Sequence, residues 1–180
     1  MLKTEFDTCL KMIKHYDPKL LNHCCRTATL AKAMAKLKGY KEETCCKMYT
    51  AGMIHDIGKI VMPPEILNKE GRLTKDERAM IDLHAFQGYC ILKNFRFEDD
   101  VCQIVLFHHG YDKPRFCSVP NPENDIINLS NIMRVADAFD ALTSERPYCA
   151  KMSSRKAIEI MLEDKAFSKE NVSILTASVL

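Results

Sequence analysis

Small and apolar residues recur at near-helical spacing between residues 18 and 38 of the chain. Asp17 followed by Pro18 is typical of a helix start, because Asp caps the free N–H groups and Pro suits the first helical position. Gly39 is typical of the residue that ends a helix. The sequence therefore predicts a helix over 18–38. Its recurring positions are Leu21, Cys25, Ala28, Ala31 and Ala35.

The rest of the chain is also predicted to be helical. Thr74 and Glu77 form a capping-box pattern that opens one of these helices. Residues 110–125 hold three prolines and are predicted to be a long loop. No segment alternates at period two for long enough to require a strand. We expect an all-α fold, a bundle-like array of about seven or eight helices. The further helices are predicted at 4–15, 42–55, 74–94, 98–109, 127–142, 153–164 and 168–178.

Composition narrows the class of protein. The 180 residues fit one domain, 1–180, and the 47% hydrophobic share is ordinary for a globular protein. A formal net charge of +2 is too small for a whole-protein surface that binds duplex nucleic acid, so we expect no such partner. The N-terminus lacks the apolar core of a signal peptide, and no 18-residue apolar run exists. We expect a cytoplasmic protein without membrane insertion.

The nine cysteines include two adjacent pairs, but no C-x-x-C pair of the kind that binds structural zinc. We interpret the cysteines as reduced, mostly buried thiols that act as small hydrophobic residues.

Two dipeptides at predicted helix ends carry the candidate chemistry, His55-Asp56 and His108-His109. A lone helical histidine is usually an ordinary surface or core residue. Adjacent side chains at a helix end, however, can turn toward a common point. Asp137 adds a carboxylate among apolar neighbours, which a metal ion would satisfy. Imidazole and carboxylate together suit Mn, Fe, Zn or Mg. The candidate ligands are His23, His55, Asp56, His84, His108, His109 and Asp137.

These residues lie in strings that resemble the HD superfamily of metal-dependent phosphohydrolases, and its HD-GYP subfamily in particular. The strings are GMIHDIGKI, ILNKEG, LHAFQGYCIL, VLFHHG and VADAFDALTSERPY, in this order along the chain. The resemblance covers almost the whole chain, with an HD-GYP-like core at about 18–178.

The resemblance implies a phosphodiesterase that hydrolyses a cyclic dinucleotide, mainly cyclic di-GMP, with a bridging hydroxide at a two-metal site. Asp56 would bridge the ions and act in catalysis together with Lys59, and Lys59 and Arg146 would bind substrate phosphates. The family's two ions are commonly Fe or Mn, and Zn, Ni or Mg also suit the ligands. One ion would be held by His23, His55, Asp56 and Asp137, and the other by Asp56, His84, His108 and His109.

The sequence departs from the family in three places. After His109 the family has a Glu, then DG and GYP, whereas this chain has Gly110 and the loop 111–118 without either motif. Lys19 stands where some members carry the Glu of a third metal, so we expect two ions. Cys149 follows the RPY string, where the family is often basic.

Two other functions therefore stay open. The altered loop is compatible with a degenerate signalling module that binds metal or nucleotide without turnover. A purely structural helical domain would leave the seven ligand-type residues without a role. Family members are often joined to a sensor domain, and a fused sensor or a homodimer is a possible arrangement here.

Overall fold

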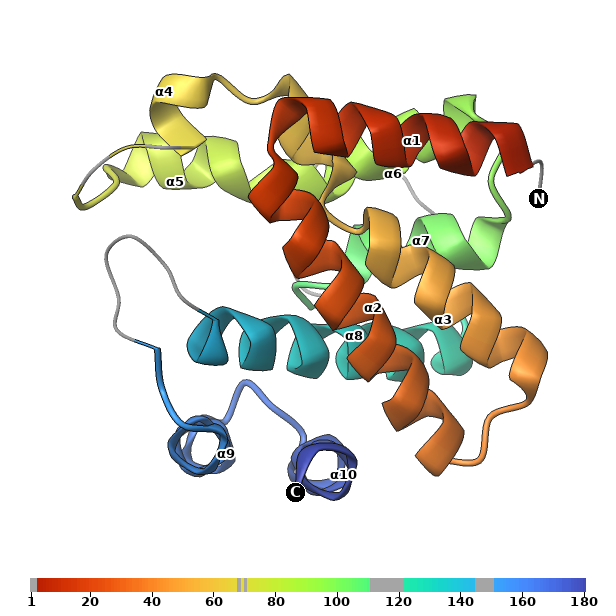
Figure 1. Ribbon diagram of the computed structural model, residues 1–180, viewed down its shortest axis with the longest axis vertical. Helices are drawn as coiled ribbons and strands as arrows, with labels where there is room; N and C mark the ends of the chain where they lie inside the picture. The colour runs from red at the N-terminus through yellow and green to blue at the C-terminus, as the bar shows by residue number, and fades with distance from the viewer. Residues whose placement is uncertain (1–2, 68, 70, 111–121, 145–150) are drawn as a thin grey trace.

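The computed structural model describes residues 3–67, 69, 71–110, 122–144 and 151–180. These residues form ten α-helices and one 3₁₀ segment and contain no strand, which confirms the all-α prediction (Figure 1). The elements are α1 (Lys3–Tyr16), α2 (Pro18–Leu37), α3 (Glu42–Ile54), η1 (Ile57–Val61), α4 (Pro64–Leu67), α5 (Lys75–Asp82), α6 (His84–Asn94), α7 (Asp99–Phe107), α8 (Asn124–Thr143), α9 (Ser154–Glu163) and α10 (Lys169–Val179).

Local capping interactions define the start of several helices as the sequence predicts. The Asp17 side chain accepts a hydrogen bond from the Lys19 backbone N–H, at 2.8 Å, and Pro18 begins α2. Thr74 and Glu77 form both hydrogen bonds of a capping box at the start of α5. Gly39, with φ of +87°, adopts after α2 a conformation that favours glycine. These contacts satisfy backbone groups that a helix end leaves free.

The helix predicted over 74–94 is divided at Leu83, so that part of the prediction is wrong. The Leu83 N–H bonds to the Met80 carbonyl three residues back, which tightens the last turn of α5 before His84 begins α6. Two short segments, η1 and α4, form between the helices predicted at 42–55 and 74–94, and α8 begins three residues earlier than expected. The helix number therefore exceeds the predicted seven or eight.

Helices α2 and α3 lie side by side and pack closely because of Gly52. A Cβ added at Gly52 would lie 2.5 Å from the Ala28 Cα, a distance that real Cβ atoms do not show. Helix α8 packs against both α2 and α7, and the buried side chains of these helices form one apolar core. The ends of α3 and α7 and the middle of α8 thereby approach the same region.

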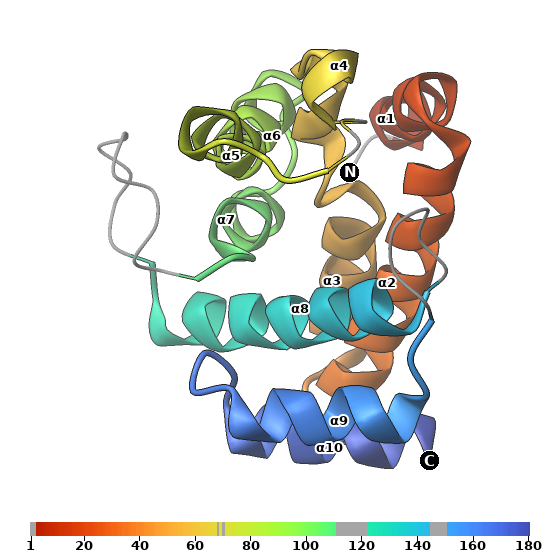
Figure 2. The same cartoon turned by 90° about the vertical axis from the view of Figure 1, so that its left-hand side faces the viewer.

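Helices α9 and α10 pack along one side of α8, whereas α5, α6 and α7 lie on its other side (Figure 2). Serine caps begin both C-terminal helices, since Ser153 accepts from the Lys156 N–H and Ser168 from the Asn171 N–H. Within the described ranges, no helix combines the length and the apolar run that crossing a bilayer requires.

Candidate metal centre

Five parts of the fold bring the seven predicted ligand residues together. His23 lies on α2, and Asp137 lies on α8. His55 and Asp56 connect α3 to η1, and His84 is the first residue of α6. His108 and His109 directly follow α7. The packing of α8 on α2 thus brings His23 and Asp137 together, although they are far apart in the sequence.

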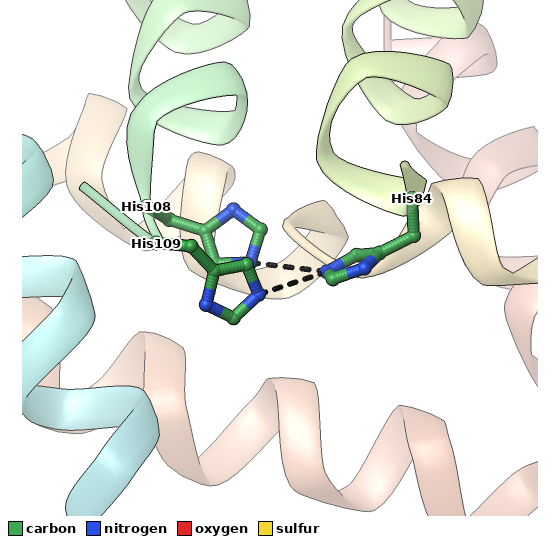
Figure 3. A group of neighbouring side chains, drawn as sticks. All are labelled: His84, His108 and His109. Carbon is green, nitrogen blue, oxygen red and sulfur yellow. Dashed lines mark hydrogen bonds between the residues drawn. The ribbon is translucent and has the colours of Figure 1, made fainter. Parts of the chain in front are cut away.

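Three histidines form one group of ligand atoms. Figure 3 shows His84, at the start of one helix, facing His108 and His109 at the end of another. The Nε2 atom of His84 lies 3.3 Å from Nε2 of His108 and 3.1 Å from Nε2 of His109. One ligand atom from each of the three lies within 4.8 Å of the others.

A second group contains His23, His55 and Asp137, whose ligand atoms also lie within 4.8 Å of one another. The His23 Nε2 atom is 3.1 Å from Asp137 Oδ1, and His55 Nε2 is 3.7 Å from the same oxygen. Imidazole nitrogens from α2 and from the end of α3 therefore face one carboxylate oxygen of α8.

Asp56 lies between the two groups and faces each with a different oxygen. Its Oδ1 is 3.2 Å from His84 Nε2 in the first group. Its Oδ2 is 3.6 Å from His23 Nε2 and 3.5 Å from His55 Nε2 in the second. The side chain is almost completely buried. A carboxylate in this position is able to contact two cations at once.

Backbone carbonyls orient three of the rings. The Nδ1 atoms of His55, His84 and His108 lie 2.8, 2.6 and 2.6 Å from the carbonyls of Gly52, Ile81 and Val105, each three residues earlier. A proton on Nδ1 satisfies this carbonyl and leaves the lone pair on Nε2. Such partners behind a metal-binding histidine fix its tautomer and direction.

The electrostatics favour neutral imidazoles at His108 and His109 beside an ionised Asp56. Burial, with the neighbouring His109, lowers the pKa of His108 well below its usual range. Burial and His84 lower the pKa of His109 to about 4. Burial raises the pKa of Asp56, but Lys59 and His55 outweigh it and hold that pKa well below its usual range. These are the protonation states in which the groups bind metal.

The residues present fit divalent cations. The His55 side chain is fully buried, and its Nε2 atom has no hydrogen-bond partner, which is costly for a buried polar atom. The clustered Nε2 atoms of three histidines likewise face one another rather than a donor. A cation in each group would satisfy these lone pairs, and the imidazole and carboxylate donors suit first-row divalent ions.

Asp140 and Arg26 also belong to this region, and neither was among the predicted ligand residues. Asp140 Oδ2 accepts a hydrogen bond from His23 Nδ1 at 2.7 Å, and Arg26 Nε donates to Asp140 Oδ1 at 2.6 Å. Burial lowers the pKa of His23, but hydrogen bonds with Asp137 and Asp140 raise it above its usual value. Asp140 lies three residues after Asp137 and Arg26 three after His23, so helical spacing offered a signal.

Of the two predicted substrate-binding residues, the structure describes Lys59 but not Arg146. The Nζ atom of Lys59 lies 2.6 Å from Asp56 Oδ2, at the edge of the centre. Arg146, Cys149 and the loop 111–118 lie outside the described residues. Gly110 has φ of +115° and turns the chain immediately after His109.

The sequence matches a family model of the HD domain over residues 7–168. The chain thus belongs to the HD domain family, which confirms the resemblance to this superfamily of phosphohydrolases and implies divalent-metal binding.

Two curated relatives are 34% identical to this chain. One is a 3'3'-cGAMP-specific phosphodiesterase of Vibrio cholerae serotype O1, matched over 77% of this chain and 32% of its own length. The other is a cyclic di-GMP phosphodiesterase of Thermotoga maritima, matched over 77% of this chain and 39% of its own length. The chain therefore spans about a third of the length of these relatives.

A solved structure has the same fold. The HD domain of the Listeria monocytogenes phosphodiesterase PgpH, in complex with cyclic-di-AMP, has a TM-score of 0.68 and 24% sequence identity. The match covers 95% of this chain and 92% of that one.

Proposed function

We propose that this chain is a metal-dependent phosphodiesterase of HD-GYP type that hydrolyses a cyclic dinucleotide. The observation that carries the proposal is the position of Asp56, whose two oxygens face separate groups of ligands. Relatives named as phosphodiesterases of cyclic di-GMP and of 3'3'-cGAMP support the substrate class. Cyclic di-GMP remains the substrate we would test first.

Two divalent ions, Fe or Mn in the first instance, would occupy the centre. His23, His55 and Asp137 would hold one ion, His84, His108 and His109 the other, and Asp56 would contact both. When bound, such ions supply an acidified water as nucleophile and stabilise charge on the phosphoryl oxygens.

The protein itself contributes position and charge. The hydrogen bonds from Nδ1 direct the histidine lone pairs into the centre, so little reorganisation is needed on binding. Lys59, whose side chain is 21% exposed, places a positive charge where a phosphate oxygen is able to reach it. Arg146 would add a planar, two-pronged contact to phosphate.

A second candidate is a signalling module that binds metal or nucleotide without turnover. Gly110 favours it, because this residue replaces an acidic side chain of the family immediately after His109. In either case we propose that the chain forms one domain with its core at about 18–178. We also propose a fused sensor domain or a homodimer as an arrangement of the whole protein, and the relatives are much longer than this chain.

The test compares His84→Gln with His15→Gln, a change at an exposed histidine of α1 outside the centre. Each protein is loaded anaerobically with Mn²⁺ or Fe²⁺, analysed for bound ions and incubated with cyclic di-GMP, 3'3'-cGAMP and cyclic-di-AMP. We expect hydrolysis by the wild type and by His15→Gln, and loss by more than about 100-fold in His84→Gln, since altering a partner behind a ligand already costs about 10–100-fold.

The outcomes separate the two candidates. Nucleotide binding by the metal-loaded wild type without any product would support the signalling module over the enzyme. A wild type that binds neither a divalent ion nor any of the three nucleotides would overturn both.

A further inference from the structure

Cys24 lies at the metal centre, although the sequence suggested an ordinary buried thiol. It follows His23 on α2, and its side chain is fully buried. Its sulfur and one ligand atom from each of His55 and Asp56 all lie within 4.8 Å of one another. All three residues are buried, so the thiol faces the centre from inside the protein.

The unpartnered nitrogen of His55 is an independent sign of a ligand at this position. The Nδ1 atom of His55 bonds to the Gly52 carbonyl, which leaves Nε2 to face the centre. This atom is buried and has no hydrogen-bond partner. A buried polar atom without a partner is costly, and a cation between His55, Asp56 and Cys24 would remove that cost.

Two of the other buried cysteines, Cys45 and Cys102, have a different environment. Cys45 donates to the Tyr40 carbonyl at 3.5 Å, and Cys102 donates to the Phe97 carbonyl at 3.7 Å. Each of these thiols is therefore satisfied by a carbonyl five residues earlier in the chain. Cys24 instead has an imidazole and a carboxylate beside it, which are the companions of sulfur in mixed metal sites.

We propose that Cys24 is a sulfur ligand of the ion held by His55 and Asp56. This inference rests on the proposed function, because it assumes that the centre binds divalent ions. On coordination the thiol releases its proton to solvent and a sulfur–metal bond forms, with no change of oxidation state.

The two ends of the centre then differ in chemistry. The group of His84, His108 and His109 offers nitrogen, with an oxygen from Asp56. The end that contains Cys24 adds a soft sulfur donor, which favours Zn²⁺, Fe²⁺ or Co²⁺ over Mn²⁺ and Mg²⁺. The protein would therefore bind a thiophilic ion at one end and accept a wider range of ions at the other.

Cobalt tests this directly, because Co²⁺ bound to a thiolate has an intense sulfur-to-cobalt charge-transfer absorption in the near ultraviolet. Wild type, Cys24→Ser and Cys25→Ser are titrated anaerobically with Co²⁺. Cys25 is exposed on the same helix and is the matched control. We expect the absorption from one cobalt per chain in wild type and Cys25→Ser, and its loss in Cys24→Ser.

A second measurement follows the metal preference of the two positions. In competition between Zn²⁺ and Mn²⁺, one position of the wild-type protein should prefer Zn²⁺. Cys24→Ser should reduce this preference by at least about 10-fold, which is the lower end of the effect of changing a partner behind a metal ligand. Wild-type protein that binds two cobalt ions without the charge-transfer absorption would overturn the role of Cys24 and leave the proposed function intact. Absence of cobalt binding, together with absence of hydrolysis, would overturn both.

Discussion

His23 differs from the other anchored histidines in the partner behind its ring. Whereas His55, His84 and His108 bond through Nδ1 to backbone carbonyls three residues earlier in the chain, His23 bonds to the Asp140 carboxylate of another helix. Asp140 is in turn held by two hydrogen bonds from Arg26. The orientation of the His23 ring therefore depends on the packing of α8 against α2. A substitution of the Asp140 side chain should change it, whereas a backbone carbonyl cannot be removed by a side-chain substitution.

Asp140→Asn should lower the affinity for the ion at the His23 end by about 10–100-fold, because the amide does not replace the carboxylate that orients the His23 ring and raises its basicity. Titration with Mn²⁺ or Co²⁺ measures the two affinities separately, and the three-histidine end should keep its affinity. Asp125→Asn, at an exposed position of the same helix, is the control. Equal weakening at both ends would indicate general damage to the fold instead.

His109 makes the folding stability of the metal-free protein depend on pH. Burial and His84 lower its pKa to about 4 in the folded state, against about 6.5 when unfolded. Folding therefore favours the neutral ring, and this contribution is complete above pH 6.5 and is lost as the pH falls toward 4.

His109→Gln should therefore lose less stability than wild type between pH 7 and pH 5, by about 1–2 kcal/mol. Urea unfolding in the presence of a chelator at both pH values measures this difference. His15→Gln should follow the wild type, since His15 is exposed. An identical loss in His109→Gln and wild type would contradict the burial of a neutral ring.

At the scale of elements, the contact between η1 and α6 sets the position of His84. A Cβ added at Gly58 would lie 1.9 Å from the His84 carbonyl oxygen and 2.6 Å from the Gly88 nitrogen. Both are backbone atoms, which cannot turn aside as a side chain does. Only glycine allows the chain after Asp56 to approach the start of α6 so closely.

Gly58→Ala should destabilise the protein by about 1–3 kcal/mol, the usual range for overpacking, and should also weaken the three-histidine end by moving His84. Urea unfolding and metal titration measure the two effects. In the comparison variant Gly88→Ala, the added Cβ meets the Val105 side chain at 3.3 Å, which is a milder contact. We expect a smaller loss there, and equal losses in the two variants would refute the backbone contact as the cause.

Much of the element structure was predictable because its signals are local. Asp17, Pro18, Gly39, Thr74 and Glu77 act within a few residues of themselves, and the structure has them in the expected roles. The break at Leu83 has no such signal, since no proline or glycine marks it. It accompanies the packing of His84 beside Gly58, a contact between distant parts of the chain.

At the scale of the whole molecule, residue types and the family resemblance together predicted the candidate ligands, but they did not predict the partners of those ligands. The helix ends that carry His55, Asp56, His108 and His109 were visible as dipeptides. The pairing of His23 with Asp140, and the approach of Cys24 to His55, depend on how α2, α3 and α8 pack. Such contacts have no periodic pattern within one segment of the chain.

Because the ligands come from separate helices, bound ions should stabilise the entire fold. An ion at about 100 times its dissociation constant adds about 2.7 kcal/mol to the free energy of unfolding. Mn²⁺ should therefore raise the urea midpoint of wild type, and a chelator should reverse the shift. His84→Gln should show a reduced response to Mn²⁺, and His15→Gln an undiminished one. If Mn²⁺ does not change the urea midpoint of the wild type, the native state does not bind the ion.

Lys59 and an incoming ion compete for one oxygen, because the lysine Nζ lies 2.6 Å from Asp56 Oδ2. Two positive charges cannot share that oxygen without strong repulsion. We therefore expect metal loading to displace the ammonium group from Asp56 and to leave it available to an anionic ligand. Binding of an anionic substrate would thus be coupled to binding of the ions, because in the chain without metal the Lys59 ammonium group is paired with Asp56.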